Sequence, residues 1–282
     1  MIISIIVLYK PDKNIFNRLE QLAKSSNKVI VILNQTDLFG AITLNIENTE
    51  LVVLGENIGL AKALNIGIRK AMNIESCEYI ALFDQDSFLD DYNSIVNITK
   101  IFKESINDKI GIIGHSNKDV KLKNETKNFN FDIEEVEDVI TSGSVLPCHV
   151  LKNVGLMDEN LFIDYIDYEW CLRAKSFGYK IYKSNKDVLS HNLGDNFIKI
   201  VGLIKPIHTN PIRKYYIIRN TLILLNRNYI SLFWKMNHFL KLFYRIPGYI
   251  ILSDNKLSSL KIIINSFYDF YQNRRIYKTY KF

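Results

Sequence analysis

The strongest constraint in this sequence is the alternation of strand-like and helix-like segments in its N-terminal third. β-Branched runs at 3–9 (ISIIVLY), 28–33 (KVIVIL), 51–54 (LVVL) and 79–83 (YIALF) are separated by helical patterns such as 58–72 (IGLAKALNIGIRKAM). Continuous apolar runs of this length are typical of strands buried on both faces of a parallel sheet. The alternation predicts an α/β fold with a mostly parallel central sheet and helices on both faces.

Polar residues follow the carboxyl ends of two of these predicted strands. Residues 9–11 (YKP) lie at the end of the first strand, and Asp84 and Asp86 follow the run at 79–83. Open α/β sheets bind their ligands beyond the carboxyl ends of the strands. Two carboxylates there suit Mg²⁺ or Mn²⁺ bridging to phosphate oxygens. The alternative is a polar turn in which Asp86 and Ser87 cap the next helix.

A second acidic group lies in the segment 155–182, GLMDENLFIDYIDYEWCLRAKSFGYKIY. Asp164 and Asp167 have the spacing of an N-cap and an N3 residue, and Glu169 and Arg173 have the spacing of an i,i+4 ion pair. A carboxylate held at the start of a helix is also what a general base requires. The residues alone therefore leave a structural and a catalytic interpretation open.

Two further features admit both a structural and a functional interpretation. His191 is either an ordinary surface or core histidine or a third metal ligand, since neutral imidazole binds Mn²⁺. Asn57 and Gly59 open a predicted helix, where glycine lets the backbone approach a ligand and free N–H groups favour anions. The alternative is a simple helix start.

Composition restricts the class of protein. Of the 282 residues, 48% are hydrophobic and 23% are charged, which is typical of a folded domain with a sizeable core. The three cysteines, Cys77, Cys148 and Cys171, are widely spaced, so we expect neither a disulfide framework nor a zinc site. This cysteine content fits a protein of the reducing cytoplasm. The run at the start lacks the basic leader of a secretory signal, and no apolar stretch approaches the ~20 residues of a membrane span.

The C-terminal quarter differs from the rest in charge. Residues 205–282 contain 14 lysines and arginines against Asp254 and Asp269 only, whereas residues 1–204 contain 22 against 28 acidic residues. We expect a catalytic domain at 1–204 and a helical, basic and aromatic segment at 205–282, interrupted at Pro247-Gly248. Residues 115–138 are predicted to form a loop or a peripheral hairpin. The basic segment predicts an anionic partner, and apolar runs such as GYIIL favour a membrane interface over nucleic acid.

Four elements occur in an order that resembles family-2 inverting glycosyltransferases of the GT-A fold. They are SIIVLYKPD, GENIGLAKALNIGI, FDQDS, and the segment 155–182 followed by SHNLGD. FDQDS and DYIDYEWCLRA look most like the rhamnosyltransferase branch of bacterial surface polysaccharide synthesis, and the resemblance covers roughly residues 2–230.

The resemblance implies a role for each matching residue. In the donor site it places Tyr9, Pro11, Asp12, Asn57, Gly59, Lys62, Asp84, Gln85, Asp86 and, in the segment YYIIRN, Arg219. Asp86, with Asp84 and His191, would hold Mg²⁺ or Mn²⁺. Asp167 falls where the family has its catalytic base, but Ile166 replaces the glutamate that many relatives have before it, so Asp164 and Glu169 remain alternatives.

The implied activity is transfer of a sugar with inversion, most simply L-rhamnose from dTDP-rhamnose, to a saccharide on a lipid diphosphate at the cytoplasmic face of the membrane. A UDP-hexose donor is the alternative. A nucleotidyltransferase would need a glycine-rich loop after the first strand, where this chain has YKPDKN, and a dehydrogenase would need G-x-G-x-x-G. We expect no nucleic-acid partner.

Overall fold

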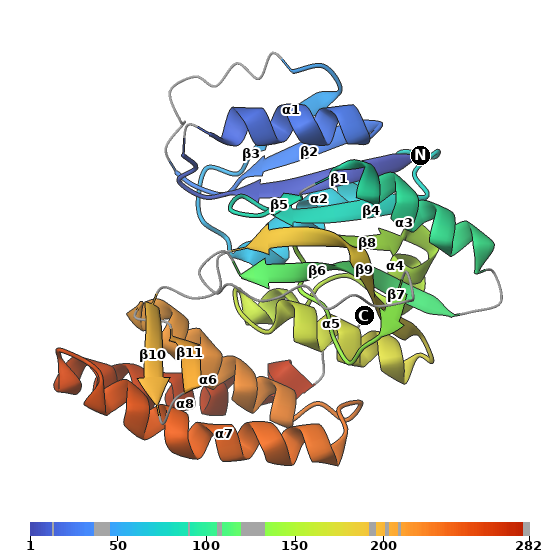
Figure 1. The fold of residues 1–282 in the computed structure, drawn as a ribbon. Coiled ribbons are helices and arrows are strands. Elements are labelled where there is room, and N and C mark those ends of the chain that lie inside the picture. Colours follow the sequence, from blue (N-terminus) through green and yellow to red (C-terminus); the bar gives the residue numbers. More distant parts are fainter. Residues whose placement is uncertain are drawn as a thin grey trace.

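The computed structural model describes residues 1–12, 14–36, 46–89, 91–105, 109–119, 133–191, 196–200, 203–207 and 210–278. Within these residues, a nine-stranded sheet lies between helices, and three long helices follow it (Figure 1). The strands of this sheet are β1 (Ile2–Leu8), β2 (Lys28–Leu33), β3 (Thr49–Val53), β4 (Tyr79–Asp84), β5 (Phe88–Leu89), β6 (Ile110–Asp119), β7 (Ile133–Glu135), β8 (Ser144–Pro147) and β9 (Lys180–His191). The helices are α1 (Ile15–Ser25), α2 (Leu60–Met72), α3 (Asn93–Glu104), α4 (Cys148–Val154), α5 (Ile166–Ser176), α6 (Pro211–Leu225), α7 (Leu232–Ile251) and α8 (Lys256–Lys278).

The sheet has the order β3-β2-β1-β4-β8-β6-β9-β5, and β7 also pairs with β9. Strands β3, β2, β1 and β4 are mutually parallel, and β9 is parallel to β6. Because β8 is antiparallel to both β4 and β6, the strands β4 and β6 run in the same direction. All the strands just named except β8, namely β1, β2, β3, β4, β6 and β9, therefore share one direction. The predicted α/β fold with a mostly parallel sheet is therefore confirmed, and the carboxyl ends of β1, β2 and β4 meet at one edge.

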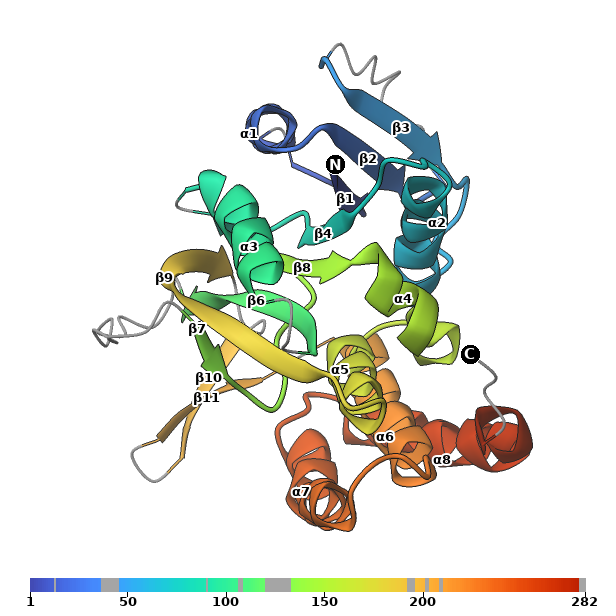
Figure 2. The same cartoon turned by 90° about the vertical axis from the view of Figure 1, so that its right-hand side faces the viewer.

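Helices cover both faces of the sheet, as the alternation predicts. Figure 2 shows α1 and α3 on one face and α2 and α4 on the other. The first face packs Ile15 and Leu19 of α1 and Ile95 of α3 on the strands. The second face packs Leu64 of α2 and Trp170 of α5 in a larger core, to which α6 also contributes.

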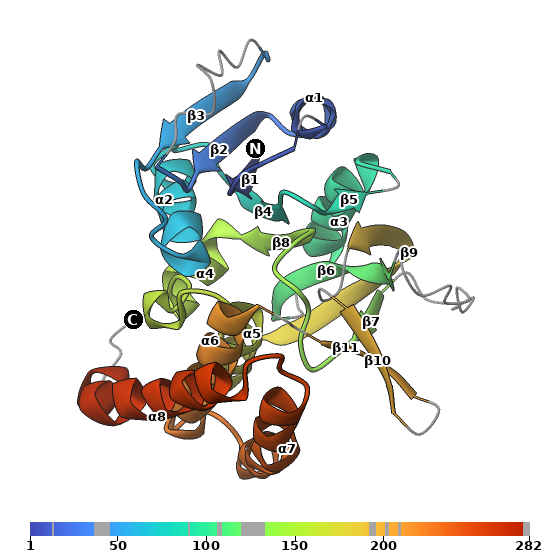
Figure 3. The same ribbon diagram turned by 90° about the vertical axis from the view of Figure 1, so that its left-hand side faces the viewer.

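Helices α6, α7 and α8 lie against one another (Figure 3). They share a small core of their own, which contains Ile218, Leu242 and Ile263. A hairpin of β10 (Asn196–Ile200) and β11 (Leu203–Ile207) precedes them, so the expected boundary at residue 204 falls within β11. The division into two domains stays a prediction. The expected break at Pro247 is wrong, because α7 continues through that residue to Ile251. Proline removes one backbone hydrogen bond, and the rest of the helix is still formed by its other residues.

The prediction of a loop or a peripheral hairpin at 115–138 is wrong in part, since β7 pairs with β9 and not with β6. The start of this segment belongs to β6, where buried His115 bonds to the hydroxyl of Ser94 and to the carbonyl of Gly143, and its end contains β7. The polar residues at its start continue a strand that begins in the apolar core. Residues 120–132 of that prediction lie outside the described residues.

Candidate active site

Glutamine side chains connect the ends of the first strands at the carboxyl edge of the sheet. The N–H of Tyr9 donates to Oε1 of Gln85 at 2.7 Å, and the N–H of Lys10 donates to Oε1 of Gln35 at 2.6 Å. Lys10 has a positive φ of 48°, so the chain turns sharply after β1. This turn brings Tyr9 and Gln85, two of the predicted donor-site residues, into direct contact.

The next predicted donor-site residues are at the start of α1. The side chain of Pro11 is buried, whereas Tyr9 is 44% exposed and Asp12 is exposed. Asp12 accepts a hydrogen bond from the N–H of Asn14 at 3.0 Å and lies 3.6 Å from Arg18. Asp12 therefore has a structural role at the turn into α1.

The start of α2 is fixed to the same edge by Asn34, which follows β2. Its Nδ2 donates to Oδ1 of Asn57 at 3.2 Å, and its Oδ1 accepts from the N–H of Ile58 at 2.9 Å. Gly59 is the N-cap with a φ of 89°, and Lys62 is exposed on the first turn. The sequence did not single out Asn34 as a site residue, although its place directly after a buried strand was a usable signal.

Asp84 and Asp86 lie at the end of β4, as predicted. Burial, and then the neighbouring carboxylate of Asp86, raise the pKa of Asp84 to about 7, while Arg213 opposes the rise. The N–H of Asp84 donates to the hydroxyl of Ser142 at 2.9 Å, which fixes the backbone at this point. Asp84 and Asp86 are two hard carboxylates, close enough for Asp86 to raise the pKa of Asp84, and they form a donor set that fits a divalent cation.

The third predicted metal ligand, His191, ends β9. Its backbone belongs to a strand that runs antiparallel to β5, with Ser190 opposite Phe88, two residues after Asp86. The side chain of His191 lies outside the described residues. Among the side chains that the structure describes, no group of three histidine, cysteine or acidic residues could hold a metal ion.

Asp167 lies in the first turn of α5 and is half-buried. Burial raises its pKa to about 7, the N–H of Tyr168 opposes the rise, and the carboxylates of Asp138 and Asp164 add to it. Asp167 lines a small cavity together with Thr141 and other residues. A carboxylate whose pKa lies near neutrality is well matched to general-base chemistry.

The capping interpretation of Asp164 at the start of α5 is wrong. Tyr165 is the N-cap and its side chain makes no capping hydrogen bond, while Asp167 accepts from the N–H of Tyr168 at 2.9 Å. Asp164 and Tyr165 have positive φ values of 63° and 67°, whereas a capping residue normally has an extended backbone. The carboxylate of Asp164 instead forms an ion pair with Arg213 of α6.

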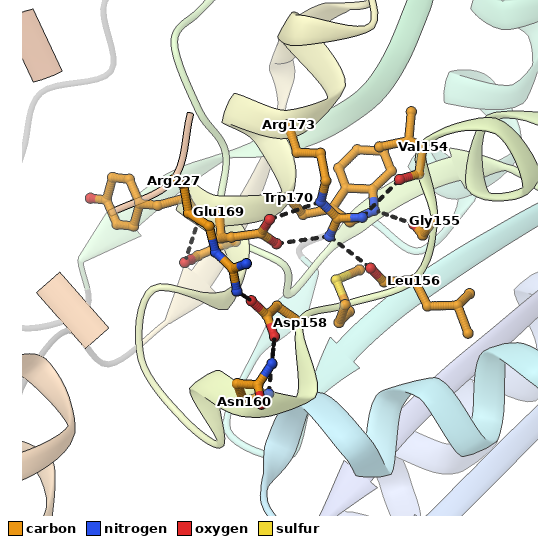
Figure 4. Close-up of polar contacts among 12 residues, drawn as sticks. Val154, Gly155, Leu156, Asp158, Asn160, Glu169, Trp170, Arg173 and Arg227 are labelled. Atoms are coloured by element: carbon orange, nitrogen blue, oxygen red, sulfur yellow. Dashed lines mark hydrogen bonds and ion pairs between the residues drawn. The ribbon is translucent and has the colours of Figure 1, made fainter. Parts of the chain in front are cut away.

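Glu169 has a structural environment that argues against its use as the base. Its carboxylate accepts two hydrogen bonds from Arg173, at 2.8 and 2.7 Å, and both side chains are fully buried (Figure 4). The hydroxyl of Tyr229 also donates to it. Arg173 further bonds the carbonyls of Val154 and Leu156, so the expected i,i+4 pair is confirmed as part of a buried network.

Arg219 is held by groups of the protein itself. It is 7% exposed, and its guanidinium donates to the carbonyls of Asn160 and Leu161 and pairs with Asp269 at 3.4 Å. These contacts make Arg219 a weaker candidate for a ligand contact than a more exposed cation, and its donor contact stays a prediction. Arg213, one of the residues that the sequence missed, is close enough to Asp84 to lower its pKa.

Electrostatic contacts connect the two acidic groups of the site. Asp86 raises the pKa of Asp84, whereas Arg213, which forms the ion pair with Asp164, lowers it. Asp164 in turn raises the pKa of Asp167. The arrangement combines a carboxylate titrating near neutrality, a cation, and two carboxylates that fit a divalent metal.

Comparison with known proteins supports one family. No family model matches the chain. It is 32% identical over 246 residues to the dTDP-rhamnosyl transferase RfbF of Shigella flexneri, covering 82% of each chain. Among solved structures, TarS of S. aureus has a TM-score of 0.56 at 18% identity, with 96% of this chain and 80% of that chain covered. GalNAc-T7, crystallised with UDP, GalNAc and Mn²⁺, has a TM-score of 0.58 at 12% identity, with 98% of this chain and 56% of that chain covered.

The two structures are GT-A-type glycosyltransferases, and at these identities they establish the fold alone. The relationship to RfbF establishes more, because it extends over most of both chains. The chain therefore belongs to the family of GT-A glycosyltransferases that includes the dTDP-rhamnosyl transferase RfbF.

Proposed function

We propose that this protein transfers an L-rhamnosyl group from dTDP-rhamnose to a hydroxyl of a saccharide acceptor, with inversion, in the synthesis of a bacterial surface polysaccharide. The named activity of RfbF supports the donor. The observation that carries the chemistry is Asp167, a carboxyl at the start of α5 whose pKa is raised to about 7.

In the proposed reaction, Asp167 removes the proton of the acceptor hydroxyl as that oxygen attacks the anomeric carbon. The bond from this carbon to the diphosphate breaks in the same displacement, so the configuration inverts and no protein nucleophile is needed. A half-buried carboxylate that is ionised only above about pH 7 is a stronger base than an ordinary aspartate. Its helix is fixed to the core by the buried pair of Glu169 and Arg173.

The departing nucleoside diphosphate carries negative charge that the site must balance. Asp84 and Asp86 would hold Mg²⁺ or Mn²⁺, which would neutralise the diphosphate oxygens when bound. Arg213 adds a cation from α6 and is 31% exposed at its side chain, so it can reach a ligand at this edge. We therefore assign to Arg213 the role first expected of Arg219.

A donor panel tests this function. Purified protein and a membrane acceptor fraction are incubated with dTDP-rhamnose, with UDP-glucose and with UDP-galactose, and release of the nucleoside diphosphate is measured. We expect release of the nucleoside diphosphate with dTDP-rhamnose but with neither UDP-hexose. The NMR signal of the anomeric proton in the product should show inverted configuration at the anomeric carbon. Turnover with a UDP-hexose alone would establish the alternative donor, and retention of configuration would contradict the role of Asp167.

We further propose that α7 and α8 hold the enzyme on an anionic membrane, where a lipid-linked acceptor would be presented. In the described part of the chain, no helix is long and apolar enough to cross a bilayer. The exposed side of α7 is nevertheless strongly apolar: Leu232 is 72% exposed, Phe233 82%, Phe243 65% and Ile251 71%. Contiguous apolar exposure of this kind is rare on monomeric proteins and indicates an interaction surface.

Charge decides which partner fits this surface. Residues 205–282 carry 14 basic against two acidic residues, and Lys256, Lys261, Arg274 and Arg275 are exposed on α8. A basic residue near an anionic leaflet contributes about 1 kcal/mol. Aromatic and aliphatic side chains beside exposed cations match the interfacial layer of an anionic membrane. On helix α6, Ile212 is 62% exposed, but Ile217, Ile218 and Leu224 are buried, so we assign only α7 and α8 to the lipid.

Liposome flotation tests this assignment. The wild-type protein should float with vesicles that contain anionic phosphatidylglycerol, and high salt should weaken the binding. The double variant Phe233→Ser, Phe243→Ser should lose it, whereas Phe16→Ser, which alters an exposed ring on α1, should not. Equal recovery of the two variants with the vesicles would contradict the proposal, and a stable dimer that loses its contact in the double variant would identify a second copy as the partner.

A further inference from the structure

Five consecutive backbone carbonyls just before α5, those of residues 160–164, accept hydrogen bonds from α2 and α6. Arg219 donates to the carbonyls of Asn160 and Leu161, and the N–H groups of Leu60 and Ala61 donate to that of Phe162 at 2.6 and 3.3 Å. The carbonyls of residues 163 and 164 accept from Asn220 of α6. The segment that leads into the proposed base is thus held by α2 and α6.

Asn220 contacts three of these five carbonyls. Its side chain is fully buried, and Nδ2 lies 2.8 Å from the carbonyls of Leu161 and Ile163 and 2.9 Å from that of Asp164. Its Oδ1 accepts from Arg219 at 3.1 and 3.0 Å, which fixes the orientation of the amide. Asn220 and Arg219 together form what we call the loop clamp.

The segment that the clamp holds has an unfavourable backbone. Three of its residues, Phe162, Asp164 and Tyr165, have φ values of 63°, 63° and 67°. Non-glycine residues in this region cost on the order of 1–3 kcal/mol each and persist only where the surroundings enforce them. The hydrogen bonds of the clamp satisfy carbonyls that a relaxed loop would turn to water.

The same segment reaches the predicted donor site. Phe162 stacks on Tyr216 of α6, with ring centroids 4.8 Å apart and planes 6° apart. Its ring also fills the space beside Gly59, where an added Cβ would lie 2.5 Å from Cδ2. Movement of this loop would therefore displace both the start of α2 and the start of α5.

We propose that Asn220, supported by Arg219, is a positioning residue for transfer: it holds the strained segment 162–165 so that Asp167 faces the acceptor hydroxyl. The proposal rests on the proposed function, because it assumes that Asp167 is the base. Neither clamp residue touches substrate in this account. They act by fixing the loop, and a displacement of about 1 Å in a catalytic group can cost ~100-fold in rate.

The test compares Asn220→Leu with Thr221→Val. Leucine has a similar volume but donates no hydrogen bond to the loop. Thr221 is equally buried on the same helix, yet its hydroxyl donates to the carbonyl of Ile217 within α6 at 2.7 Å, so Thr221→Val is a matched control. Turnover, donor affinity and the pH midpoint of turnover are measured on protein shown to be folded by circular dichroism.

Asn220→Leu should lower kcat roughly 100-fold, a larger change than the accompanying loss in affinity for dTDP-rhamnose, and the pH midpoint should move. Thr221→Val should change none of these. If Asn220→Leu is folded and keeps the wild-type kcat and pH midpoint, the clamp has no positioning role. If Asn220→Leu fails to fold, Arg219→Lys, which keeps the charge but not the forked donors, is tested by the same criteria.

Asp167→Asn in the same assay separates the two proposals. An active Asp167→Asn would overturn the proposed function whatever the clamp variants do. An inactive Asp167→Asn beside a fully active, folded Asn220→Leu would overturn the clamp alone.

Discussion

Replacing Asp167 by asparagine should remove transfer and, at the same time, stabilise the fold above neutral pH. Asparagine keeps the size of the side chain and most of its hydrogen bonds, but it cannot take a proton from the acceptor. The variant should therefore bind donor normally and release no nucleoside diphosphate. Wild-type turnover should rise with pH about a midpoint near 7, because the base must be ionised and its pKa is raised to about 7.

The effect on stability follows from the same pKa. Burial raises the pKa of Asp167 from 3.8 to about 7, so the folded protein holds this proton more tightly than the unfolded chain. The stabilisation from the bound proton is complete below the unfolded value and is lost as pH rises through the folded value. The rise corresponds to about 4 kcal/mol at most, an upper bound because the side chain is partly open to solvent.

Asparagine has no proton to lose, so the variant does not lose this stability. Between about pH 5 and pH 8, the stability of Asp167→Asn relative to wild type should increase by about 2–3 kcal/mol. Urea unfolding followed by circular dichroism at both pH values measures this change. Asp254→Asn, which removes an exposed carboxylate between α7 and α8, should show no such dependence and serves as control.

Two results would refute the reasoning. If Asp167→Asn retains wild-type turnover, another group is the base. If the stability difference is the same at both pH values, the carboxyl of Asp167 is not desolvated in the folded protein, and its match to base chemistry is lost.

The remaining predictions concern the metal site, the start of α2 and the buried pair. Asp86→Ala should remove turnover while leaving the thermal unfolding midpoint nearly unchanged, and EDTA should inactivate the wild type until Mn²⁺ is added; full activity in EDTA would contradict this. Gly59→Ala should destabilise the protein by about 1–3 kcal/mol, because its φ is 89° and the new Cβ would meet the ring of Phe162; an unchanged midpoint in calorimetry would argue against that contact. Glu169→Gln should cost about 3–5 kcal/mol in urea unfolding, since it leaves the buried Arg173 without its carboxylate partner, and a cost near zero would mean that the pair is solvated.

The sequence predicted well what depends on periodicity and on strand ends. The buried runs gave the parallel strands, and the position of Asp84 and Asp86 directly after one of them predicted the edge where they lie. The spacing of Glu169 and Arg173 was sufficient to predict their contact. These features depend on residues that are close in sequence, or on a rule that holds for all parallel sheets.

The choice between Arg213 and Arg219 could not be made in this way. Both lie on α6, a helix with buried residues on several sides, such as Ile217 and Leu224, so no single polar face indicated which arginine lies near Asp84. The capping interpretation of Asp164 at the start of α5 failed for another reason. Asp164 has the sequence signature of a capping residue, but the clamp holds it at positive φ, a tertiary effect that local sequence does not encode.

The contacts of Asp269 connect α8 to α6 and so limit how far α8 can be altered independently. This residue is one of the two acids in the basic segment, and from α8 it accepts a hydrogen bond from Tyr215 at 2.8 Å and pairs with Arg219 of the loop clamp. We therefore expect that α8 cannot be deleted, or replaced by the corresponding helix of another enzyme, without an effect on the rate of transfer. A truncation before α8 should impair turnover even with a water-soluble acceptor, and evolution can exchange this helix only together with the part of α6 that it supports.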